Sequence, residues 1–193
     1  ETQKEFIEKI QETLEKKTNL IAHVPTGTGK SAAVLGVALS FALKNKLTVF
    51  FLTPKHTQHK IAIETLKLIK QKYNLDFSVV DLIGKKWMCA QQGVIDLTTG
   101  EFYDYCKDLV EHKQCIYYNN LKKEEKYSVE TTVTIEELKQ KISHVEELRE
   151  ISKDRMLCPF EIACILAKRS SVIIADYHHI LNPSIRDHML DRI

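Results

Sequence analysis

The stretch that decides the fold is Val24-Pro25-Thr26-Gly27-Thr28-Gly29-Lys30-Ser31. It follows a short apolar segment, residues 19–23, and opens an alanine- and valine-rich segment, residues 31–43. Hydrophobic periodicity therefore predicts a strand, a glycine loop and a helix in that order. Glycines let successive backbone N–H groups curl around a phosphate without a Cβ in the way, and the helix N-terminus adds partial positive charge. The stretch is thus expected to bind phosphate.

Two side chains in this loop carry its chemistry. In loops of this kind the lysine reaches the β- and γ-phosphates of a nucleotide, and the hydroxyl that follows it binds Mg²⁺. The strict pattern G-x-x-x-x-G-K-[ST] lacks its first glycine because Val24 stands there, whereas P-T-G-x-G-K-[ST], frequent among helicases, is matched in full. The alternative is a turn without a ligand, but a turn needs one glycine and has no use for a lysine followed by a hydroxyl. We predict that ATP and Mg²⁺ bind to Pro25, Thr26, Gly27, Thr28, Gly29, Lys30 and Ser31, with Lys30 and Ser31 in the catalytic role.

Length and composition set broad limits. The 193 residues suit one or two domains, and the net charge of +2 argues neither for nor against a nucleic-acid partner. No apolar run approaches the ~20 residues that a membrane span needs, and the charged N-terminal residues do not resemble a signal peptide. We expect no membrane association and an intracellular location, cytoplasmic in a prokaryote or nuclear in a eukaryote. Five cysteines in such a compartment bind metal or do redox work more often than they form disulfides.

The first part of the chain alternates between two periodicities. Helical spacing and short apolar runs follow one another, which predicts an α/β fold with a parallel sheet and right-handed crossovers. The expected strands are residues 19–23, 47–52 and 77–83, and the expected helices are residues 2–16, 31–43 and 58–72.

The alternation stops at about Gly84 and returns at Pro159. Between them the chain is rich in lysine, glutamate, tyrosine and cysteine, and a charged helix is expected over residues 135–149. We interpret residues 84–158 as a small, mostly helical insertion. Residues 1–83 and 159–193 then form one α/β domain, with a helix at 159–168, a strand at 171–175 and a short helix at 177–181.

Four cysteines of this region could bind one metal ion or cluster together. Four thiolates can hold a [4Fe–4S] cluster or a tetrahedral Zn²⁺, but the long, irregular spacings lack the C-x₂-C pair of zinc ribbons. Buried, unligated cysteines are the alternative, and spacing alone leaves the choice open. Cys164 lies among apolar residues and is expected in the core. The four candidate ligands are Cys89, Cys106, Cys115 and Cys158.

Several of these features together resemble the XPD family of iron–sulfur superfamily 2 DNA helicases. Gln3 before Phe6 is similar to the glutamine motif, residues 24–31 match motif I, and Leu52-Thr53-Pro54-Lys55-His56-Thr57-Gln58 is similar to motif Ia. The four cysteines occur in the family's order, and Ala175-Asp176-Tyr177-His178-His179-Ile180-Leu181-Asn182-Pro183 resembles its strand and short helix before motif II.

The resemblance implies a RecA-like P-loop sheet flanked by helices, in an ATP-dependent DNA helicase that acts in DNA repair. It further implies that Gln3 contacts adenine and that the four cysteines hold a [4Fe–4S] cluster. Single-stranded DNA is then expected at the loop of Lys55, His56, Thr57 and Gln58, and at Lys85 and Lys86 beside the cluster. Without the resemblance, that loop could equally be a polar turn with Thr57 as a helix cap.

The departures from the family pattern also shape our expectations. The D-E-A-H of motif II is absent from residues 1–193, and Asp176, followed by Tyr177, lacks the glutamate of that motif. The second motor lobe, with its arginine finger, and the arch domain are absent too. We therefore expect a fragment that ends before motif II and is inactive alone. The alternative function is a P-loop nucleotide-binding protein with a zinc or redox cysteine site and no role with nucleic acid.

Overall fold

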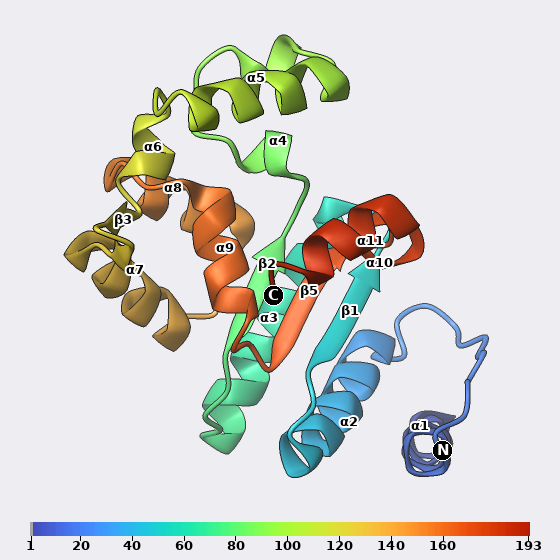
Figure 1. Cartoon of the computed structure of the whole chain (residues 1–193). Helices are drawn as coiled ribbons and strands as arrows, with labels where there is room; N and C mark the ends of the chain where they lie inside the picture. The colour runs from blue at the N-terminus through green and yellow to red at the C-terminus, as the bar shows by residue number, and fades with distance from the viewer. Residues whose placement is uncertain (1) are drawn as a thin grey trace.

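A three-stranded parallel sheet lies at the centre of the computed structural model, which describes residues 2–193. The strands are β1 (Val49–Thr53), β2 (Val79–Leu82) and β5 (Val172–Asp176), in the order β1-β5-β2. Val49 and Val79 both pair with Val172, so the three strands end at a common carboxyl edge. The α/β fold predicted from the sequence is confirmed (Figure 1).

Each face of the sheet packs into its own hydrophobic cluster. Successive side chains of a strand point to opposite faces, so neighbouring residues of β5 enter different clusters. One cluster joins the sheet to α2 (Lys30–Asn45) and α3 (His56–Tyr73) through residues such as Leu35, Leu66 and Ile174. The other joins it to α9 (Pro159–Ala167) and includes Ile162 and Ile173. The strands are thus buried on both sides, as is usual for a parallel sheet.

The first helix, α1 (Thr2–Lys16), forms where the sequence predicts it and packs against α2. The predicted strand at residues 19–23 is wrong, because this segment is irregular and Ile21 is fully exposed. A strand needs a neighbour for its N–H and C=O groups. Among the residues that the structure describes, none pairs with this segment.

The insertion is built mostly from helices. The predicted helix over residues 135–149 is two helices, α7 (Val129–Gln140) and α8 (Val145–Asp154). The break lets Ile142 pack into the α2–α3 cluster while Leu138 and Leu148 pack into the other cluster. One straight helix could not serve both. The remaining elements are α4 (Lys85–Met88), the 3₁₀ turn η1 (Val94–Asp96), α5 (Thr99–Glu111), α6 (Ile116–Asn119) and the hairpin of β3 (Lys122–Lys123) and β4 (Lys126–Tyr127).

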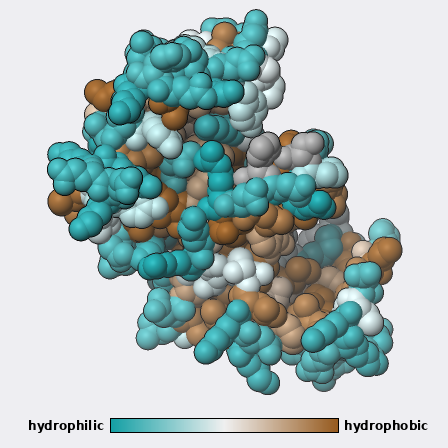
Figure 2. All heavy atoms as spheres, viewed as in Figure 1, coloured by the Kyte–Doolittle hydropathy of each residue, from teal (hydrophilic) through white to brown (hydrophobic). Residues whose placement is uncertain are grey.

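The chain returns to the sheet through α9 and β5 and then forms α10 (His178–Leu181) and α11 (Pro183–Leu190). Pro159 occupies the first turn of α9, as its missing N–H favours. In the view shared by Figures 1 and 2, hydrophilic residues cover the region at the top where α5 lies. Within residues 2–193, no helix is both long and apolar enough to cross a bilayer.

Candidate functional site

The predicted phosphate loop leads directly into α2, which begins at Lys30. Gly27 and Gly29 have φ of 80° and 75°, in the left-handed region where a Cβ is disfavoured. A Cβ on Gly29 would also lie 2.9 Å from Nε2 of Gln3, a residue of α1. The structure thus brings Gln3 and the glycine loop together, although 25 residues separate them in sequence.

The side chain of Lys30 folds back over this loop. Its Nζ donates to the carbonyl oxygens of Val24, at 3.0 Å, and Pro25, at 2.8 Å. The hydroxyl of Thr28 donates to the same Pro25 carbonyl at 2.9 Å. Phosphate oxygens are stronger acceptors for an ammonium than carbonyl oxygens are, because the bond is then assisted by both charges. The lysine is therefore close to the place where phosphates would meet the loop.

A cavity of about 940 Å³ opens at the carboxyl edge of the sheet. This is the edge at which open α/β folds bind ligands. The predicted loop supplies one side through Lys55, His56 and Thr57. Thr57 is not the cap of α3, because Lys55 precedes the first residue of that helix. The rest of the wall is Thr53, Pro54, Asp176, Tyr177, His178, Leu181, Asn182 and Pro183.

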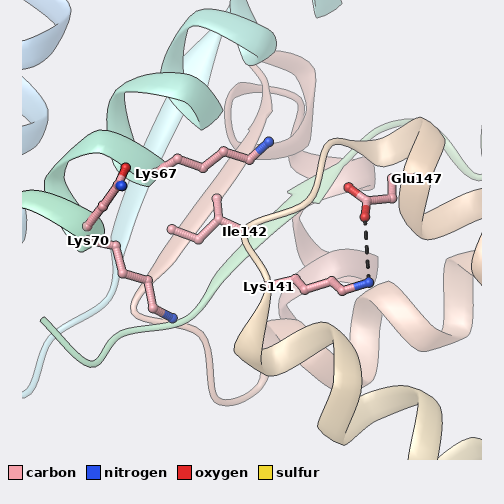
Figure 3. Close-up of a pocket in the computed structure, with 6 residues that line it drawn as sticks. Lys67, Lys70, Lys141, Ile142 and Glu147 are labelled. Carbon is pink, nitrogen blue, oxygen red and sulfur yellow. Dashed lines mark ion pairs between the residues drawn. The ribbon is translucent and has the colours of Figure 1, made fainter. Parts of the chain in front are cut away.

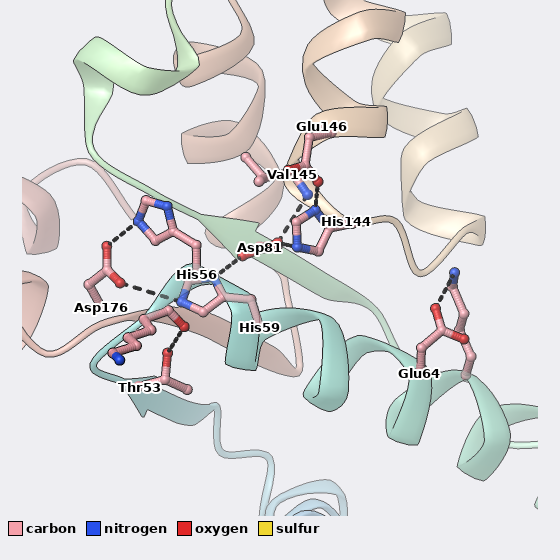
Figure 4. A network of polar contacts seen from close by, with 11 residues as sticks. Thr53, His56, His59, Glu64, Asp81, His144, Val145, Glu146 and Asp176 are labelled. Carbon is pink, nitrogen blue, oxygen red and sulfur yellow. Dashed lines mark hydrogen bonds and ion pairs between the residues drawn. The ribbon is translucent and has the colours of Figure 1, made fainter.

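A chain of polar contacts runs from this cavity into the interior (Figure 4). His56 Nε2 lies 2.9 Å from Asp176 Oδ2, and the other oxygen of Asp176 lies 3.6 Å from His59 Nε2. His59 Nδ1 contacts Asp81 Oδ1 at 2.6 Å, and Oδ2 of Asp81 accepts from the backbone N–H of Val145 at 3.0 Å. The sequence analysis did not identify His59 or Asp81. The available signal was a carboxylate inside the buried run Val79–Leu82.

Two more histidines lie near this chain. His144, which precedes α8, contacts Glu146 and has Nε2 3.6 Å from Asp81 Oδ2. Burial lowers the pKa of His144 below its ordinary value, and the nearby Asp81 partly opposes this effect. Burial also lowers the pKa of His179 in α10. Both rings therefore favour the neutral form.

A second cavity, of about 380 Å³, lies between α3 and the link from α7 to α8 (Figure 3). Lys70 Nζ crosses it to the carbonyl oxygens of Phe77 and Gln140, at 3.0 and 3.3 Å. Lys141 lies 3.9 Å from Glu147 and pairs with Glu137 at 2.9 Å. These lysines hold protein groups together, and we assign no ligand to the cavity.

The four candidate cysteine ligands come from four separate segments. Cys89 follows α4, Cys106 lies in α5, Cys115 precedes α6 and Cys158 precedes α9. All five cysteines are free thiols. Electrostatic interactions link Cys89 to Cys106 and Cys115, and link Cys158 to Cys115. Over residues 2–193, however, no three Cys, His, Asp or Glu side chains converge closely enough to hold one metal ion.

The surroundings of these thiols fit a metal-bound cluster in chemistry, although not in distance. Burial raises the pKa of Cys158 to about 12 and also raises that of Cys89. Burial alone would lower the pKa of Lys85, but Cys106, Glu161 and Cys158 together raise it, so its ammonium faces a region that can hold negative charge. A metal removes the proton of a thiol outright. The four cysteines and Lys85 thus suit an anionic cluster, whereas Cys164 lies buried in α9.

The two basic residues beside the cysteines are turned toward the protein. Lys85 Nζ lies 5.5 Å from the ring centroid of Phe160, and Lys86 donates to the carbonyl of Leu97 while lying 5.1 Å from the ring centroid of Trp87. Gln58, by contrast, is exposed in the first turns of α3. The structure therefore leaves the loop at residues 55–58 more accessible to a ligand than Lys85 and Lys86.

The sequence model of the DEAD_2 family matches residues 51–193. Over 95% of this chain, the "General transcription and DNA repair factor IIH helicase subunit XPD/RAD3" of Saccharomyces cerevisiae is 21% identical. A "Regulator of telomere elongation helicase 1 homolog" of Caenorhabditis briggsae is 22% identical over 96% of the chain. This chain covers 26% and 21% of those relatives, so it spans about a quarter of their length.

Solved structures show the same arrangement of elements. An "XPD_Helicase" matches 96% of this chain with a TM-score of 0.64 and 20% identity, and the chain covers 29% of it. A "Truncated XPD" matches 94% with a TM-score of 0.61 and 19% identity, and the chain covers 47% of it. At such identities the likeness concerns the fold. Together with the family match, it confirms the resemblance to XPD helicases found in the sequence.

Proposed function

Because the chain belongs to the DEAD_2 family, we propose that it is the nucleotide-binding lobe, with a cysteine-bearing insertion, of an XPD-type ATP-dependent DNA helicase. The observation that carries this proposal is the loop before α2. Its two left-handed glycines, the folded-back Lys30 and the contact of Gln3 with Gly29 form one cradle. The yeast relative is named for DNA repair, and we extend that role and an intracellular location, nuclear in a eukaryote, to this protein.

In this cradle Lys30 would exchange its carbonyl acceptors for the β- and γ-phosphates of ATP. The hydroxyl of Ser31 would bind Mg²⁺, which neutralises phosphate charge. Gln3, whose Nε2 lies near Gly29, would contact the base. Residues 1–193 contain no D-E-A-H, so this chain alone should hydrolyse ATP negligibly.

The experiment that tests this function is a titration with ATP and Mg²⁺, in which calorimetry measures the binding affinity. Lys30→Ala should weaken binding by about 10- to 100-fold, because a charged hydrogen bond contributes about 1.5–3 kcal/mol. Lys44→Ala is the matched control, since Lys44 is an exposed lysine in the same helix. Equal affinities for the two variants would contradict the proposed cradle. Rapid ATP hydrolysis by the chain alone would contradict its proposed inactivity. Asp176 would then become a candidate metal ligand.

For the insertion we propose a [4Fe–4S] cluster held by Cys89, Cys106, Cys115 and Cys158. The cluster would supply a fixed point that ties four segments together, and Lys85 would balance part of its negative charge. Anaerobic purification followed by iron and sulfide analysis tests this assignment. A visible absorbance with matching iron and sulfide supports it.

One alternative is a zinc or redox cysteine site without a role with nucleic acid, but the sulfurs are not grouped as a single tetrahedral Zn²⁺ would require. A colourless, zinc-containing protein that ignores DNA would establish that alternative.

The proposed nucleic-acid site is the cavity at the carboxyl edge of the sheet. Single-stranded DNA would place its phosphates against Lys55, His56, Thr57 and Gln58, with Lys85 and Lys86 as further contacts near the cluster. Binding should be weak, at about 10⁻⁴–10⁻⁶ M, and should fall as salt rises because phosphates release counterions. A fluorescence titration with oligo-dT at several salt concentrations measures both properties. Lys55→Ala should lower the salt slope, whereas Lys44→Ala should not.

A further inference from the structure

Two ionisable side chains are fully buried side by side in the lobe. His59 of α3 and Asp81 of β2 both have side chains with no exposed area, and their atoms Nδ1 and Oδ1 are 2.6 Å apart. Burying such a pair costs more free energy than burying apolar side chains of similar size. Neither residue belongs to the predicted nucleotide, cysteine or DNA sites. Their position therefore calls for another explanation.

At one end the pair holds the start of a helix in the insertion. Asp81 Oδ2 accepts from the N–H of Val145, the first residue of α8, at 3.0 Å. The first N–H groups of a helix have no partner within the helix, and a carboxylate there also favours the helix dipole. His144 precedes α8 but makes no side-chain cap. The sheet therefore supplies the cap of α8 through Asp81.

At the other end the pair reaches the cavity at the sheet edge. His59 Nε2 faces Asp176 Oδ1 at 3.6 Å, and His56 Nε2 contacts the second oxygen of Asp176 at 2.9 Å. His59 therefore lies between two carboxylates, with Nδ1 toward Asp81 and Nε2 toward Asp176. Asp176 thus bridges the two histidines, because one of its oxygens contacts His56 and the other faces His59. Both His56 and Asp176 line the cavity.

We propose that His59 and Asp81 are positioning residues that couple this cavity to the N-terminus of α8. A phosphate of single-stranded DNA, the ligand of the proposed function on which this step rests, would draw His56 away from Asp176. Asp176 would then move away from His59. The His59 ring and Asp81 would in turn shift relative to the N–H of Val145. Two discrete arrangements of His56 thereby bias the order of α8.

Hydrogen exchange of the Val145 and Leu148 amides tests the coupling without DNA. Asp81→Ala removes the oxygen that accepts the Val145 N–H, and should speed exchange at Val145 by about tenfold. Asp176→Asn should change that exchange at least about fivefold, the lower range for coupled sites. Glu64→Gln is the matched control, because Glu64 is an exposed carboxylate on α3 that pairs with Lys67. It should change nothing.

Two substitutions of His59 separate the halves of the path. Asn places a donor near the position of Nδ1, and Gln places one near Nε2. His59→Asn should therefore keep the cap of α8 but abolish the effect of Asp176→Asn. His59→Gln should loosen α8 even when Asp176 is intact. Because these core variants risk unfolding, the comparison of Asp176→Asn with Glu64→Gln in the native background decides the matter.

Three outcomes separate this inference from the proposed function. If Asp176→Asn behaves like Glu64→Gln, the coupling is overturned. If Asp176→Asn shifts α8 but oligo-dT fails to bind, the coupling stands and the proposed DNA site falls. If oligo-dT binds at the cavity and leaves the exchange of α8 unchanged, the proposed function stands and the coupling to DNA is overturned.

Discussion

The two halves of the insertion are held in place differently. Residues 129–154, which we term the α7–α8 segment, share a hydrophobic cluster with the sheet through Ile135, Leu138, Val145 and Leu148. Residues 84–119, which we term the cysteine segment, contribute Met88 to that cluster, and their other buried apolar side chains lie outside it. Phe102 is buried in α5, but Tyr103 and Tyr105 on the same helix are exposed.

This difference shows where the fold needs more than apolar burial. The free energy gained by burial grows with the apolar area removed from water. The α7–α8 segment gains it from the core of the lobe, to which the cysteine segment contributes Met88. Three of the four candidate ligands lie in the cysteine segment, and the fourth, Cys158, begins α9. The thiols thus lie where a metal cluster bound by all four would stabilise the chain most.

The largest effect should come from removing a thiol. Serine at Cys89, Cys106, Cys115 or Cys158 should release the bound iron and raise amide exchange across the cysteine segment by about 100-fold or more, because small metal-held domains unfold without their metal. The α7–α8 segment should keep its protection. Iron analysis and exchange mass spectrometry measure the two effects. Cys164→Ser is the control, and our ligand assignment fails if it releases iron while Cys115→Ser does not.

Truncating a side chain of the shared core should instead destabilise the lobe together with the α7–α8 segment. Leu148→Ala should lower the free energy of unfolding of the lobe by about 2–5 kcal/mol, because it leaves a cavity beside the sheet. Urea denaturation followed by circular dichroism measures this loss. Val133→Ala on α7 is the control, since Val133 is 51% exposed. If Leu148→Ala affected only the insertion, the α7–α8 segment would not share the core of the lobe.

A smaller effect distinguishes two glycines of similar chemistry. A Cβ at Gly36 in α2 or at Gly100 in α5 would have open space among the described residues. Alanine in a helix is favoured over glycine by up to about 1 kcal/mol, so Gly36→Ala should raise the free energy of unfolding of the lobe by that amount. Gly100→Ala should leave the urea midpoint unchanged, because α5 lies outside the shared core. Equal shifts would show that both halves unfold together.

The smallest effect concerns the pH dependence of stability. Burial lowers the pKa of His179 from its ordinary value of 6.5, so the unfolded chain binds the proton more readily than the folded lobe does. The stabilisation is therefore present above about pH 6.5 and is lost as pH falls through the lowered pKa. His179→Gln should reduce this loss in urea titrations at pH 7 and below. His23→Gln, at an exposed position before the glycine loop, is the control.

Local patterns in the sequence predicted the parts of the molecule that depend on local chemistry. Helix periodicity located α1, α2 and α3 within a few residues, and the glycine spacing placed a glycine loop directly before α2. Side chains at i and i+4 lie on one face of a helix whatever surrounds it, and a left-handed backbone favours glycine in any fold. The family resemblance came from the same loop and from the order of the cysteines.

Contacts between distant segments decided the rest. Residues 19–23 are apolar enough for a strand, but pairing requires a neighbour that only the fold can supply. The break between α7 and α8 arises because Ile142 and Leu148 pack into different clusters, and these clusters exist only once the sheet has formed. Asp81 is one polar residue in an apolar run. Only tertiary structure brings it to His59 and Val145, which are 22 and 64 residues away. The sequence by itself determined the glycine loop before α2 and the supply of thiols, because both follow from residue type and short spacing. Tertiary structure alone decided which buried polar side chains meet, since the cost of burying them is offset only by partners brought together from across the chain.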